Sequence, residues 1–468
     1  MNQNIPENVK KILMTLTDNG YDGYVVGGAV RDYVMGNEPH DWDIATNAKP
    51  EQVKSLFRRT LDTGIKHGTV TAKIGDEGYE ITTYRCDGLY SDGRHPDSVE
   101  FVDRIEDDLA RRDFTINAMA MDVNGNIVDP FGGLDDIKRG VIRCVGNPDD
   151  RFSEDALRMM RAVRFESKFG FELDSETKEA IVRNADGLKN VSAERVCDEF
   201  TKILVSANPK KGFIDAYETG ITKRVLPEFD RMMECEQNTP YHYANVGIHT
   251  LDAVENIRPD PMLRWTMLLH DAGKPVTKEH DRGRDTFYGH PSASKEIADD
   301  VMRRLRFSNK ERMIIDSFIE NHDLTMTKPH KIRKFAGIHG ADYVENLCEV
   351  KVADAKAHAP KYQAAIMQEH MAFIDKCRAY IADGTAIRSS DLNINGYVLQ
   401  EHGIHGEAIG KFMKQAYETC LAQPELNTRE ALVKMADKQV ERHEQRVSAA
   451  EHLLPLSNDV VDDKIFDK

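Results

Sequence analysis

Apolar positions follow a helical period at the start of the chain and a strand-like pattern after it. Val9, Ile12, Leu13 and Leu16 recur at i, i+3, i+4 and i+7, so the pattern predicts a helix over residues 6–17. β-Branched and aromatic residues then dominate several short extended runs. These runs are 24–26, "DWDI" from 41, "TVTAKI" from 69, "YEITTYR" from 79 and "VEFV" from 99. We therefore expect a mixed α/β head domain over residues 1–146.

After residue 147 the pattern is helical almost throughout. Residues 147–240 predict an all-α neck, and residues 241–383 predict a helical body rich in histidine. The polar stretch from 384 to 395 is typical of a linker into a helical tail over 384–468, whose end "DVVDDKIFDK" is acidic. The expected fold class is therefore multidomain, with an α/β head followed by all-α domains.

Composition limits the kind of protein this is. A chain of 468 residues with 40% hydrophobic and 30% charged residues is long enough for several globular domains. No apolar run approaches the ~18 residues of a membrane span, and the N-terminus lacks the apolar core of a secretion signal. Seven scattered cysteines without a CxxC pair indicate reduced thiols and exclude a structural zinc ribbon. We expect a cytoplasmic protein.

The charge distribution is uneven. The net charge of −16 argues against a chain wrapped around nucleic acid, because phosphate binding leaves a basic footprint. Between residues 151 and 168, however, five basic residues face three acidic ones. This segment predicts a local cationic surface within an acidic whole.

Two glycines stand where a strand turns into a helix, in "YVVGGAVRD". Gly27 and Gly28 would let backbone N–H groups approach a phosphate without a Cβ in the way, and Arg31 follows one turn later. A plain tight turn explains a Gly-Gly pair equally well on its own.

Three carboxylates are candidates for a metal site. Asp41 and Asp43 stand at i and i+2 in an extended segment, so both point from the same face. Oxygen ligands of this kind suit Mg²⁺, and paired ions ~3.5 to 4 Å apart can activate a hydroxyl and hold a leaving pyrophosphate. Glu80 is the best third carboxylate. The alternatives are a solvated acidic loop and a surface glutamate on an edge strand.

These residues match the opening signature of a known family. Gly27, Gly28, Arg31, Asp32, Asp41 and Asp43 resemble the head of poly(A) polymerases and tRNA nucleotidyltransferases, and later motifs follow in the family's order. These are "RRDFTINAMA" (111–120), "DPFGGLDDI" (129–137), "RFSEDALRMMRAVRF" (151–165) and "SAERVCDEF" (192–200). The chain resembles the bacterial CCA-adding type. This implies template-independent addition and repair of the tRNA 3'-terminal CCA from CTP and ATP, with Mg²⁺ at Asp41 and Asp43.

The motif "EDxxR" carries the expected choice of base. The pattern predicts one helix with Asp155 and Arg158 neighbours on one face, where a simple i, i+3 ion pair is the structural alternative. A carboxylate acceptor beside a guanidinium donor matches the pairing edges of cytosine and adenine, whereas uracil and guanine leave both groups unmatched, at ~1 to 3 kcal/mol each. The resemblance assigns this role to Asp155 and Arg158.

Other basic residues are expected around the nucleotide. Each three-residue step turns a helix by about 60°, so Arg161 is expected near the base or sugar and Arg164 near phosphate, unless they form a solvated face or support the neck. By resemblance Arg112 holds the nucleotide, while Asp113 and Asn117 either contribute to that site or support it.

The polar loop "CDGLYSDGRHPDSVEF" (86–101) favours full CCA addition, since relatives that add only CC lack much of it. Poly(A) polymerases share the same head, so a poly(A) polymerase remains an alternative function, although the "EDxxR" spacing favours C and A over A alone.

The histidine-rich body resembles an HD domain. His270 and Asp271 are adjacent in "LLHDAGKP", and His249 and Asp354 match the remaining ligands of that superfamily, with His290 and His322 as additional histidines. Such a set can bind one or two divalent transition metals. The resemblance implies phosphatase or cyclic phosphodiesterase chemistry on nucleotides or RNA ends; a retained scaffold is the alternative.

The tail also resembles the family's tail domain, which implies binding to the tRNA elbow. Gly403, Gly406 and Gly410 lie around a helix start, where backbone amides could contact phosphate or the glycines could serve turns and caps. The expected partners are therefore tRNA, CTP and ATP, with no membrane, and no protein partner can be inferred. Two further alternatives are an HD hydrolase with a nucleotide-sensing head and a noncatalytic RNA-binding protein.

Overall fold

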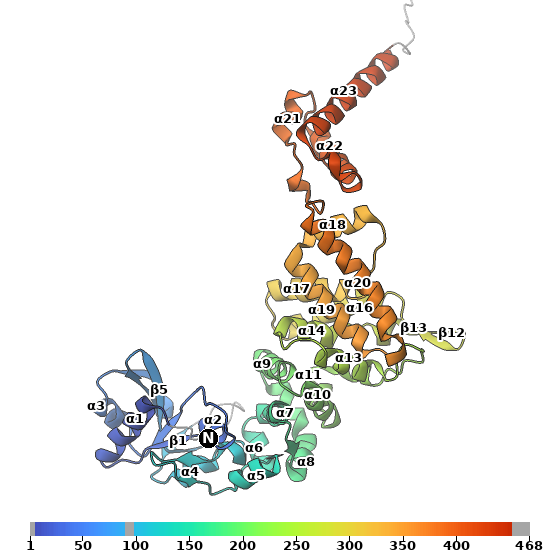
Figure 1. Cartoon of the computed structure of the whole chain (residues 1–468). Coiled ribbons are helices and arrows are strands. Elements are labelled where there is room, and N and C mark those ends of the chain that lie inside the picture. The colour runs from blue at the N-terminus through green and yellow to red at the C-terminus, as the bar shows by residue number, and fades with distance from the viewer. Residues whose placement is uncertain (1–4, 89–97, 452–468) are drawn as a thin grey trace, which may run out of the picture. The chain divides into compact units, whose positions relative to one another are not determined.

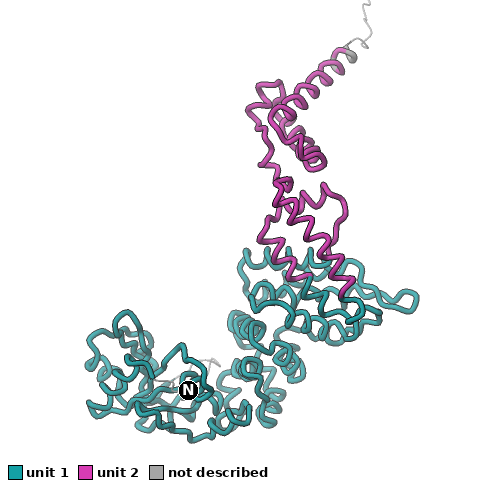
Figure 2. The backbone as a smooth tube through the Cα atoms, viewed as in Figure 1, with its two compact units in different colours: residues 1–323, 352–363 teal, residues 324–351, 364–468 magenta. Residues whose placement is uncertain are grey.

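The computed structural model describes residues 5–88 and 98–451, and the chain packs into two compact units. One unit comprises residues 1–323 and 352–363, and the other comprises residues 324–351 and 364–468 (Figure 2). The predicted site residues of the head, the neck and the histidine cluster lie in the first unit. The expected histidine-rich body, 241–383, is divided between the two units, and the expected tail lies in the second.

A seven-stranded sheet organises the head, in the order β3-β4-β5-β2-β1-β8-β9 (Figure 1). The pair β2 and β5 is parallel, with Ile44 beside Ile81, and the other neighbours are antiparallel. The strands are β1 (Tyr24–Val26), β2 (Ile44–Thr46), β3 (Thr60–Gly64), β4 (Thr69–Ile74), β5 (Glu77–Thr83), β8 (Ala120–Met121) and β9 (Ile127–Val128). A separate antiparallel ribbon joins β6 (Arg85–Asp87) to β7 (Val99–Phe101).

Helices complete the head. The first helix, α1, buries Val9, Ile12, Leu13 and Leu16 in the main core of the head, as their spacing predicts. Each such side chain contributes about 1.5 to 3 kcal/mol when fully buried. The head helices are α1 (Glu7–Asp18), α2 (Gly28–Val34), α3 (Pro50–Leu56), α4 (Ile105–Ala110) and α5 (Gly133–Arg139), with short 3₁₀ turns at Ile65–His67 and Thr115–Asn117.

Short helices continue the first unit through the neck. They are α6 (Pro148–Glu154), α7 (Leu157–Phe169), α8 (Ser175–Asn184), α9 (Ala193–Leu204), α10 (Pro209–Glu218), α11 (Ile221–Val225) and α12 (Pro227–Met233), with a 3₁₀ turn at Ala185–Asn190. The histidine-rich part follows with α13 (Val246–Glu255), α14 (Pro261–Leu269), α15 (Lys274–Thr277), α16 (His290–Arg304) and α17 (Asn309–Asn321).

The second unit is helical. Its elements are α18 (Pro329–His339), α21 (Gly396–Glu401), α22 (Glu407–Ala422), α23 (Arg429–Glu451) and 3₁₀ turns at Ser389–Asp391 and Pro424–Leu426. Two long helices, α19 (Ala341–Ala357) and α20 (Pro360–Ala382), each have residues in both units. Leu399, Phe412 and Leu432 belong to the separate core that α21, α22 and α23 share.

The expected fold class is confirmed: a mixed α/β head precedes mostly helical domains. The structure adds two strand pairs that the hydrophobic pattern does not predict, namely β10 (Val141–Ile142) with β11 (Glu172–Leu173) and the hairpin of β12 (Glu279–Asp281) and β13 (Arg284–Thr286). The expected boundaries at 146, 240 and 383 stay predictions. Among the described residues, no helix is both long and apolar enough to cross a membrane.

Candidate functional site

The three predicted carboxylates lie at neighbouring strands of the head sheet. Asp41 and Asp43 stand in the extended segment just before β2, and the parallel register of β2 with β5 brings Glu80 beside Asp43. Burial raises the pKa of Asp43, Arg112 opposes this, and the charges of Glu80 and Asp41 raise it further. In the described chain the three do not converge as closely as the histidine ligands below, whose atoms lie within 4.8 Å of one another. Mutual repulsion between clustered carboxylates is what a divalent cation would relieve.

The glycine pair allows two arginines to approach the backbone. Gly27 has φ +70°, and a Cβ there would lie 2.9 Å from Nη1 of Arg112. A Cβ on Gly28 would lie 3.3 Å from Nη2 of Arg31. Arg31 is buried and donates from Nε to Asp32 at 2.9 Å. The glycines therefore make room for guanidinium groups as well as for any ligand.

A buried chain of polar contacts links the head to α7. Arg31 donates to Asn117 at 2.6 Å, Asn117 donates to Asp113 at 3.1 Å, and Arg161 donates from Nε to Asp113 at 2.8 Å. Burial by itself would raise the pKa of Asp113, but Arg161 and the amide of Asn117 lower it to about 2. Asp113 and Asn117 thus connect two of the predicted nucleotide-binding arginines.

The "EDxxR" segment differs from its prediction. A single helix was expected, but α6 ends at Glu154 and α7 begins at Leu157, with Asp155 in an extended conformation between them (φ −146°, ψ 103°). Asp155 accepts a hydrogen bond from the Leu157 N–H at 3.0 Å, as a capping aspartate does. The ion pair of Asp155 with Arg158, which is the structural alternative to base selection, does not form, because the break in the helix gives each side chain another partner.

The observed partners are close. Asp155 Oδ2 lies 2.6 Å from Nη2 of Arg195 on α9. Arg158 Nη1 lies 2.5 Å from Oε2 of Glu154, and its Nη2 donates to the carbonyl of Arg111 at 3.2 Å. Sequence reasoning missed Arg195, which lies inside "SAERVCDEF" 40 residues from its partner.

The other predicted arginines are also paired. Arg164 Nε lies 2.7 Å from Glu199 Oε2, and Arg112 Nη2 lies 3.2 Å from Asp108 Oδ2. Burial lowers the pKa of Arg164, and Glu199 opposes this. The guanidinium of Arg164 also lies 4.2 Å from the ring centroid of Phe165.

These side chains line one cavity of about 510 Å³, here called the basic cavity. Its lining holds seven arginines and one lysine against three aspartates, so a polyanion is attracted into it. The basic residues are Arg31, Arg111, Arg112, Arg158, Arg161, Arg164, Lys168 and Arg195, and the acidic ones are Asp43, Asp113 and Asp155. Asp41 and Glu80 are not among its lining residues.

A second cluster gathers the predicted HD residues around Asp271. His249 Nε2 and His270 Nε2 each lie 3.4 Å from Asp271 Oδ2, whereas His290 Nε2 lies 3.4 Å from Oδ1. Asp354 Oδ1 lies 3.0 Å from His249 Nε2, and His322 Nε2 lies 4.0 Å from Asp271 Oδ1. The two oxygens of one carboxylate thus face two histidine pairs.

Each histidine is oriented through its other ring nitrogen. The Nδ1 atoms of His249, His270, His290 and His322 contact the backbone carbonyls of Ala357, Met267, Phe287 and Ile319, at 3.2, 2.7, 2.9 and 2.6 Å. This leaves Nε2 for the cluster, as in protein metal sites. Buried Asp271 Oδ1 has no hydrogen-bond partner and faces the Nε2 atoms of His290 and His322 at 3.4 and 4.0 Å, so the residues fit a divalent cation.

Two members of the cluster have the ionisation that a metal site needs, but the pKa of His270 is raised: burial would lower it, and Asp271 and Asp354 raise it. Burial lowers the pKa of His322 to about 3, helped by the charges of His270 and His290. Burial would raise the pKa of Asp271, but His270 and Lys274 hold it well below its usual range. A neutral imidazole and an ionised carboxylate are the forms that ligate metals.

Around the cluster lies a cavity of about 420 Å³, here called the histidine cavity. It brings in His242, Lys274 and His358, which sequence reasoning missed. Lys274 Nζ lies 2.6 Å from Asp271 Oδ2, and "HDAGK" was the signal for it. His242 and His358 group with His249 as further metal-ligand candidates.

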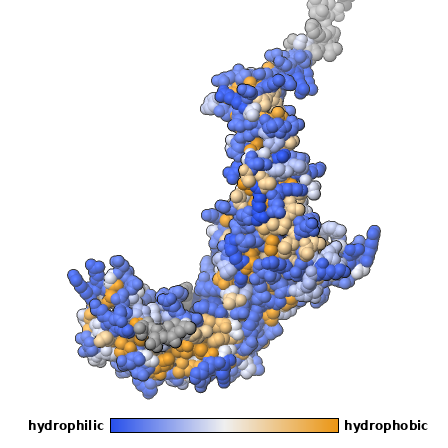
Figure 3. Space-filling model, in the orientation of Figure 1, coloured by the Kyte–Doolittle hydropathy of each residue, from blue (hydrophilic) through white to orange (hydrophobic). Residues whose placement is uncertain are grey.

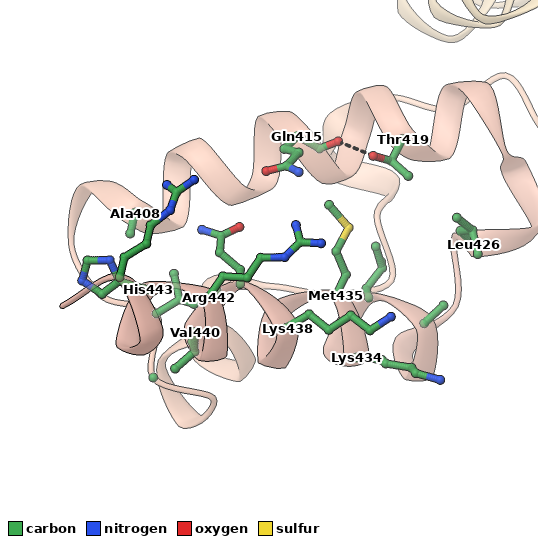
Figure 4. Close-up of a pocket in the computed structure, with 16 residues that line it drawn as sticks. Ala408, Gln415, Thr419, Leu426, Lys434, Met435, Lys438, Val440, Arg442 and His443 are labelled. Carbon is green, nitrogen blue, oxygen red and sulfur yellow. Dashed lines mark hydrogen bonds between the residues drawn. The ribbon is translucent and has the colours of Figure 1, made fainter. Parts of the chain in front are cut away.

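The second unit contains a groove between α22 and α23 (Figure 4). Its volume is about 820 Å³, and Lys434, Lys438, Arg442 and Arg446 line it at four-residue intervals along one face of α23. Gln415 and Thr419 of α22 face these side chains. Among the described residues no carboxylate lines this groove.

The glycines of the tail fit turn duties. Gly403 and Gly406 have positive φ angles of +82° and +59°, and Gly406 directly precedes α22. Gly403 also lines the groove. The central residues of the polar loop, 89–97, and the acidic end of the chain lie outside the described residues.

Comparisons with known proteins agree along the chain. The model of the poly A polymerase head domain matches residues 23–143, that of the probable RNA and SrmB-binding site of polymerase A matches 170–233, and the HD domain model matches 241–358.

Individual proteins match as well. A CCA-adding enzyme of Leuconostoc mesenteroides is 33% identical over 432 residues, which is 92% of this chain and 95% of that protein. One of Lactobacillus helveticus is 49% identical over 229 residues, which is 49% of this chain and 57% of that protein, so the match spans little more than half of that relative. The crystal structure of the Bacillus stearothermophilus CCA-adding enzyme in complex with CTP is 28% identical, with a TM-score of 0.67, and covers 93% of this chain and 98% of that one.

Proposed function

The chain belongs to the family of CCA-adding enzymes, and we propose that it adds and repairs the 3'-terminal CCA of tRNA. It uses CTP and ATP, needs no nucleic-acid template and releases pyrophosphate. The observation that carries this proposal is the basic cavity, where paired arginines surround a glycine turn beside carboxylates on neighbouring strands.

The metal-binding role belongs to the head carboxylates. Asp41 and Asp43, with Glu80 beside Asp43, would hold Mg²⁺, which activates the attacking hydroxyl and stabilises charge on the leaving pyrophosphate. Their crowding supports this role, because Glu80 and Asp41 both raise the pKa of Asp43.

The basic cavity orients the nucleotide. Arg31 and Arg112 flank Gly27 and Gly28, where a triphosphate would lie without a Cβ in its way. The tRNA 3'-oxygen bonds to the α-phosphorus and the bond to pyrophosphate breaks. Arg164 would contact phosphate, and Arg161, which donates to Asp113, would lie near the base or sugar.

Base choice falls to Asp155 and Arg158. The carboxylate accepts a hydrogen bond from the amino group of cytosine or adenine, and the guanidinium donates a hydrogen bond to the ring nitrogen beside that amino group. Both line the basic cavity, which supports this role even though they do not pair with each other. Uracil and guanine would leave both groups unmatched.

The tail groove is the proposed contact to tRNA. Four basic side chains at helical spacing would supply phosphate contacts in a chain whose net charge is −16. A cytoplasmic location completes the proposal, since tRNA is the substrate and all seven cysteines are free thiols.

The decisive experiment uses tRNA that lacks its CCA end. The protein is incubated with Mg²⁺ and CTP, ATP or both, and products are resolved at single nucleotides. We expect CC with CTP alone and CCA with both. A long adenylate ladder would instead indicate a poly(A) polymerase, and no extension would refute the transferase.

The histidine cavity supports a second candidate function, metal-dependent hydrolysis of phosphate esters on nucleotides or RNA ends. Buried Asp271 Oδ1, which has no hydrogen-bond partner and faces His290 and His322, supports it. A bound transition metal would supply an activated water. Metal analysis of the purified protein, with hydrolysis of 2',3'-cyclic nucleotides before and after chelation, tests it; a metal-free protein that hydrolyses nothing after Mn²⁺ or Ni²⁺ addition refutes it.

A further inference from the structure

We infer that Arg195 and Glu154 are positioning residues that fix Asp155 and Arg158 before a nucleotide arrives. This inference rests on the proposed CCA addition and assigns part of its base specificity. Arg195 lines the basic cavity beside Asp155, and Glu154 lies against Arg158; each has the opposite charge to the group it holds.

Asp155 needs a fixing partner because it lies at a break between helices. The residue is extended between the end of α6 and the start of α7, so no regular helix dictates its side-chain direction. Its Oδ1 accepts the Leu157 N–H at 3.0 Å and its Oδ2 lies 2.6 Å from Arg195. Both oxygens are therefore aimed by contacts from two different helices, α7 and α9.

Arg158 is held from three directions. Glu154 Oε2 lies 2.5 Å away, and the carbonyls of Arg151 and Arg111 accept hydrogen bonds at 3.3 and 3.2 Å. Glu154 is itself fixed, because its Oε1 lies 2.5 Å from Arg151. The plane of the guanidinium is thus determined by the neck and by the head together.

These pairs differ from ordinary surface ion pairs. The side chains of Arg158 and Asp155 are 12% and 14% exposed, whereas Arg183 and Asp149, an ion pair between α8 and α6, are 49% and 42% exposed. Low exposure limits the screening of charges by water and salt. The pairs Asp155–Arg195 and Glu154–Arg158 therefore restrict side-chain motion more strongly than the exposed pair Arg183–Asp149 does.

Rigid placement matters for selectivity. A mobile carboxylate could turn away from the carbonyl of uracil, and the repulsion that rejects uracil would then be lost. A fixed carboxylate cannot turn away, so the repulsion remains. Fixing the pair in advance also removes the need to order it when CTP or ATP binds. Arg195 therefore affects the difference in binding between correct and incorrect bases, and it affects the chemical step only indirectly.

The test compares Arg195→Ala, Arg195→Lys and Glu154→Gln with Arg183→Ala, which removes the exposed ion pair. The ratio of kcat/KM for CTP to that for UTP is measured on tRNA lacking CCA. We expect Arg195→Ala to lower this ratio about ten-fold, mainly through KM. Arg195→Lys should recover part of it because it keeps the charge, and Glu154→Gln should lower it by freeing Arg158. Arg183→Ala should leave it unchanged.

Equilibrium binding of CTP and UTP without tRNA separates this inference from the transferase itself. A wild-type preference for CTP that Arg195→Ala loses supports the inference even where no transfer is seen. Folded Arg195→Ala protein, checked by its Tm, that keeps the wild-type ratio in binding and in incorporation overturns it.

Discussion

The basic cavity and the histidine cavity are similar in size but leave opposite needs unmet. All seven arginines of the basic cavity have a carboxylate partner, for example Arg161 with Asp113 and Arg164 with Glu199. By hydrogen-bond geometry, however, the buried Nε of Arg112 in the basic cavity has no acceptor, and the buried Oδ1 of Asp271 in the histidine cavity has no donor. The unmet group is a donor suited to an anion in one cavity and an acceptor suited to a cation in the other.

This difference indicates how each cavity binds its ligand. Paired arginines keep their positions between turnovers while their excess positive charge still attracts a nucleotide that must come and go. Inward-facing imidazoles and an unsolvated carboxylate instead favour a cation that stays bound. The first unit thus contains one site suited to a nucleotide that is exchanged and one site suited to a cation that stays bound.

The largest expected effect tests the cation dependence of the head. Asp41→Ala with Asp43→Ala should lower nucleotide incorporation by about 10³-fold or more while leaving tRNA binding intact. Asp62→Ala, an aspartate on β3 that pairs with Lys54, is the matched control. Single-nucleotide product analysis measures the effect. Retained incorporation would remove the two aspartates from the metal site.

The next effect separates the two cavities. His270→Ala with Asp271→Ala should abolish bound metal and any metal-dependent phosphate hydrolysis, yet leave CCA addition largely unchanged. His402 and Asp437, an ion pair in the second unit at 2.7 Å, supply the control double variant. Metal content and both activities are measured. A loss of CCA addition would mean that the histidine cluster stabilises the part of the fold that carries the transferase site. The two cavities would then not be independent sites.

A moderate effect is expected in the tail groove. Lys438→Glu with Arg442→Glu should weaken tRNA binding about ten-fold and flatten its salt dependence, because phosphate contacts release counterions. Lys411→Glu on α22, outside the groove lining, is the control. Binding is titrated at several salt concentrations. An unchanged salt slope would exclude these side chains as phosphate contacts.

The smallest effect on activity is expected from a carboxylate on α7 that does not line the basic cavity but affects the stability of the fold. Burial and Asp215 raise the pKa of Glu166 from 4.5 to about 8, against the opposing charge of Lys211. The folded chain therefore keeps a proton that the unfolded chain releases, and the free energy of unfolding falls as the pH rises from about 4.5 to about 8.

Glu166→Gln should remove this decline. Urea unfolding of wild type and variant at pH 5 and pH 8 measures it, with Glu179→Gln on α8 as an exposed control. Equal pH dependence in wild type and Glu166→Gln would contradict the assignment.

Local patterns were enough to predict part of the fold. The spacing of Val9, Ile12, Leu13 and Leu16 predicts α1 because its apolar face is buried whatever the rest of the chain does. The hairpin 279–286 was missed because charged residues conceal any alternation, and only Gly283 signals its turn. In Figure 3, this projecting hairpin is coloured hydrophilic.

Predicting the site depended on distance along the chain. Adjacent or motif-bound residues such as His270 and Asp271 were found, but the partnership of Asp155 with Arg195 spans 40 residues. The helix break at Asp155 contains neither glycine nor proline, so the usual signals of interruption are absent. The capping preference of aspartate was the one local sign that a second helix begins there.

The order of strands in the head has a consequence for synthesis of the protein. Strand β1 lies between β2 and β8, and Val25 is paired with Met121 almost a hundred residues later. A ribosome therefore has to release the chain beyond β8 before β1 has both neighbours, and β5 before Asp43 has Glu80 beside it. A nascent chain stopped earlier would contain the aspartates and the glycine turn without the strands that pair beside them, so the proposed addition to tRNA ends would require the completed head.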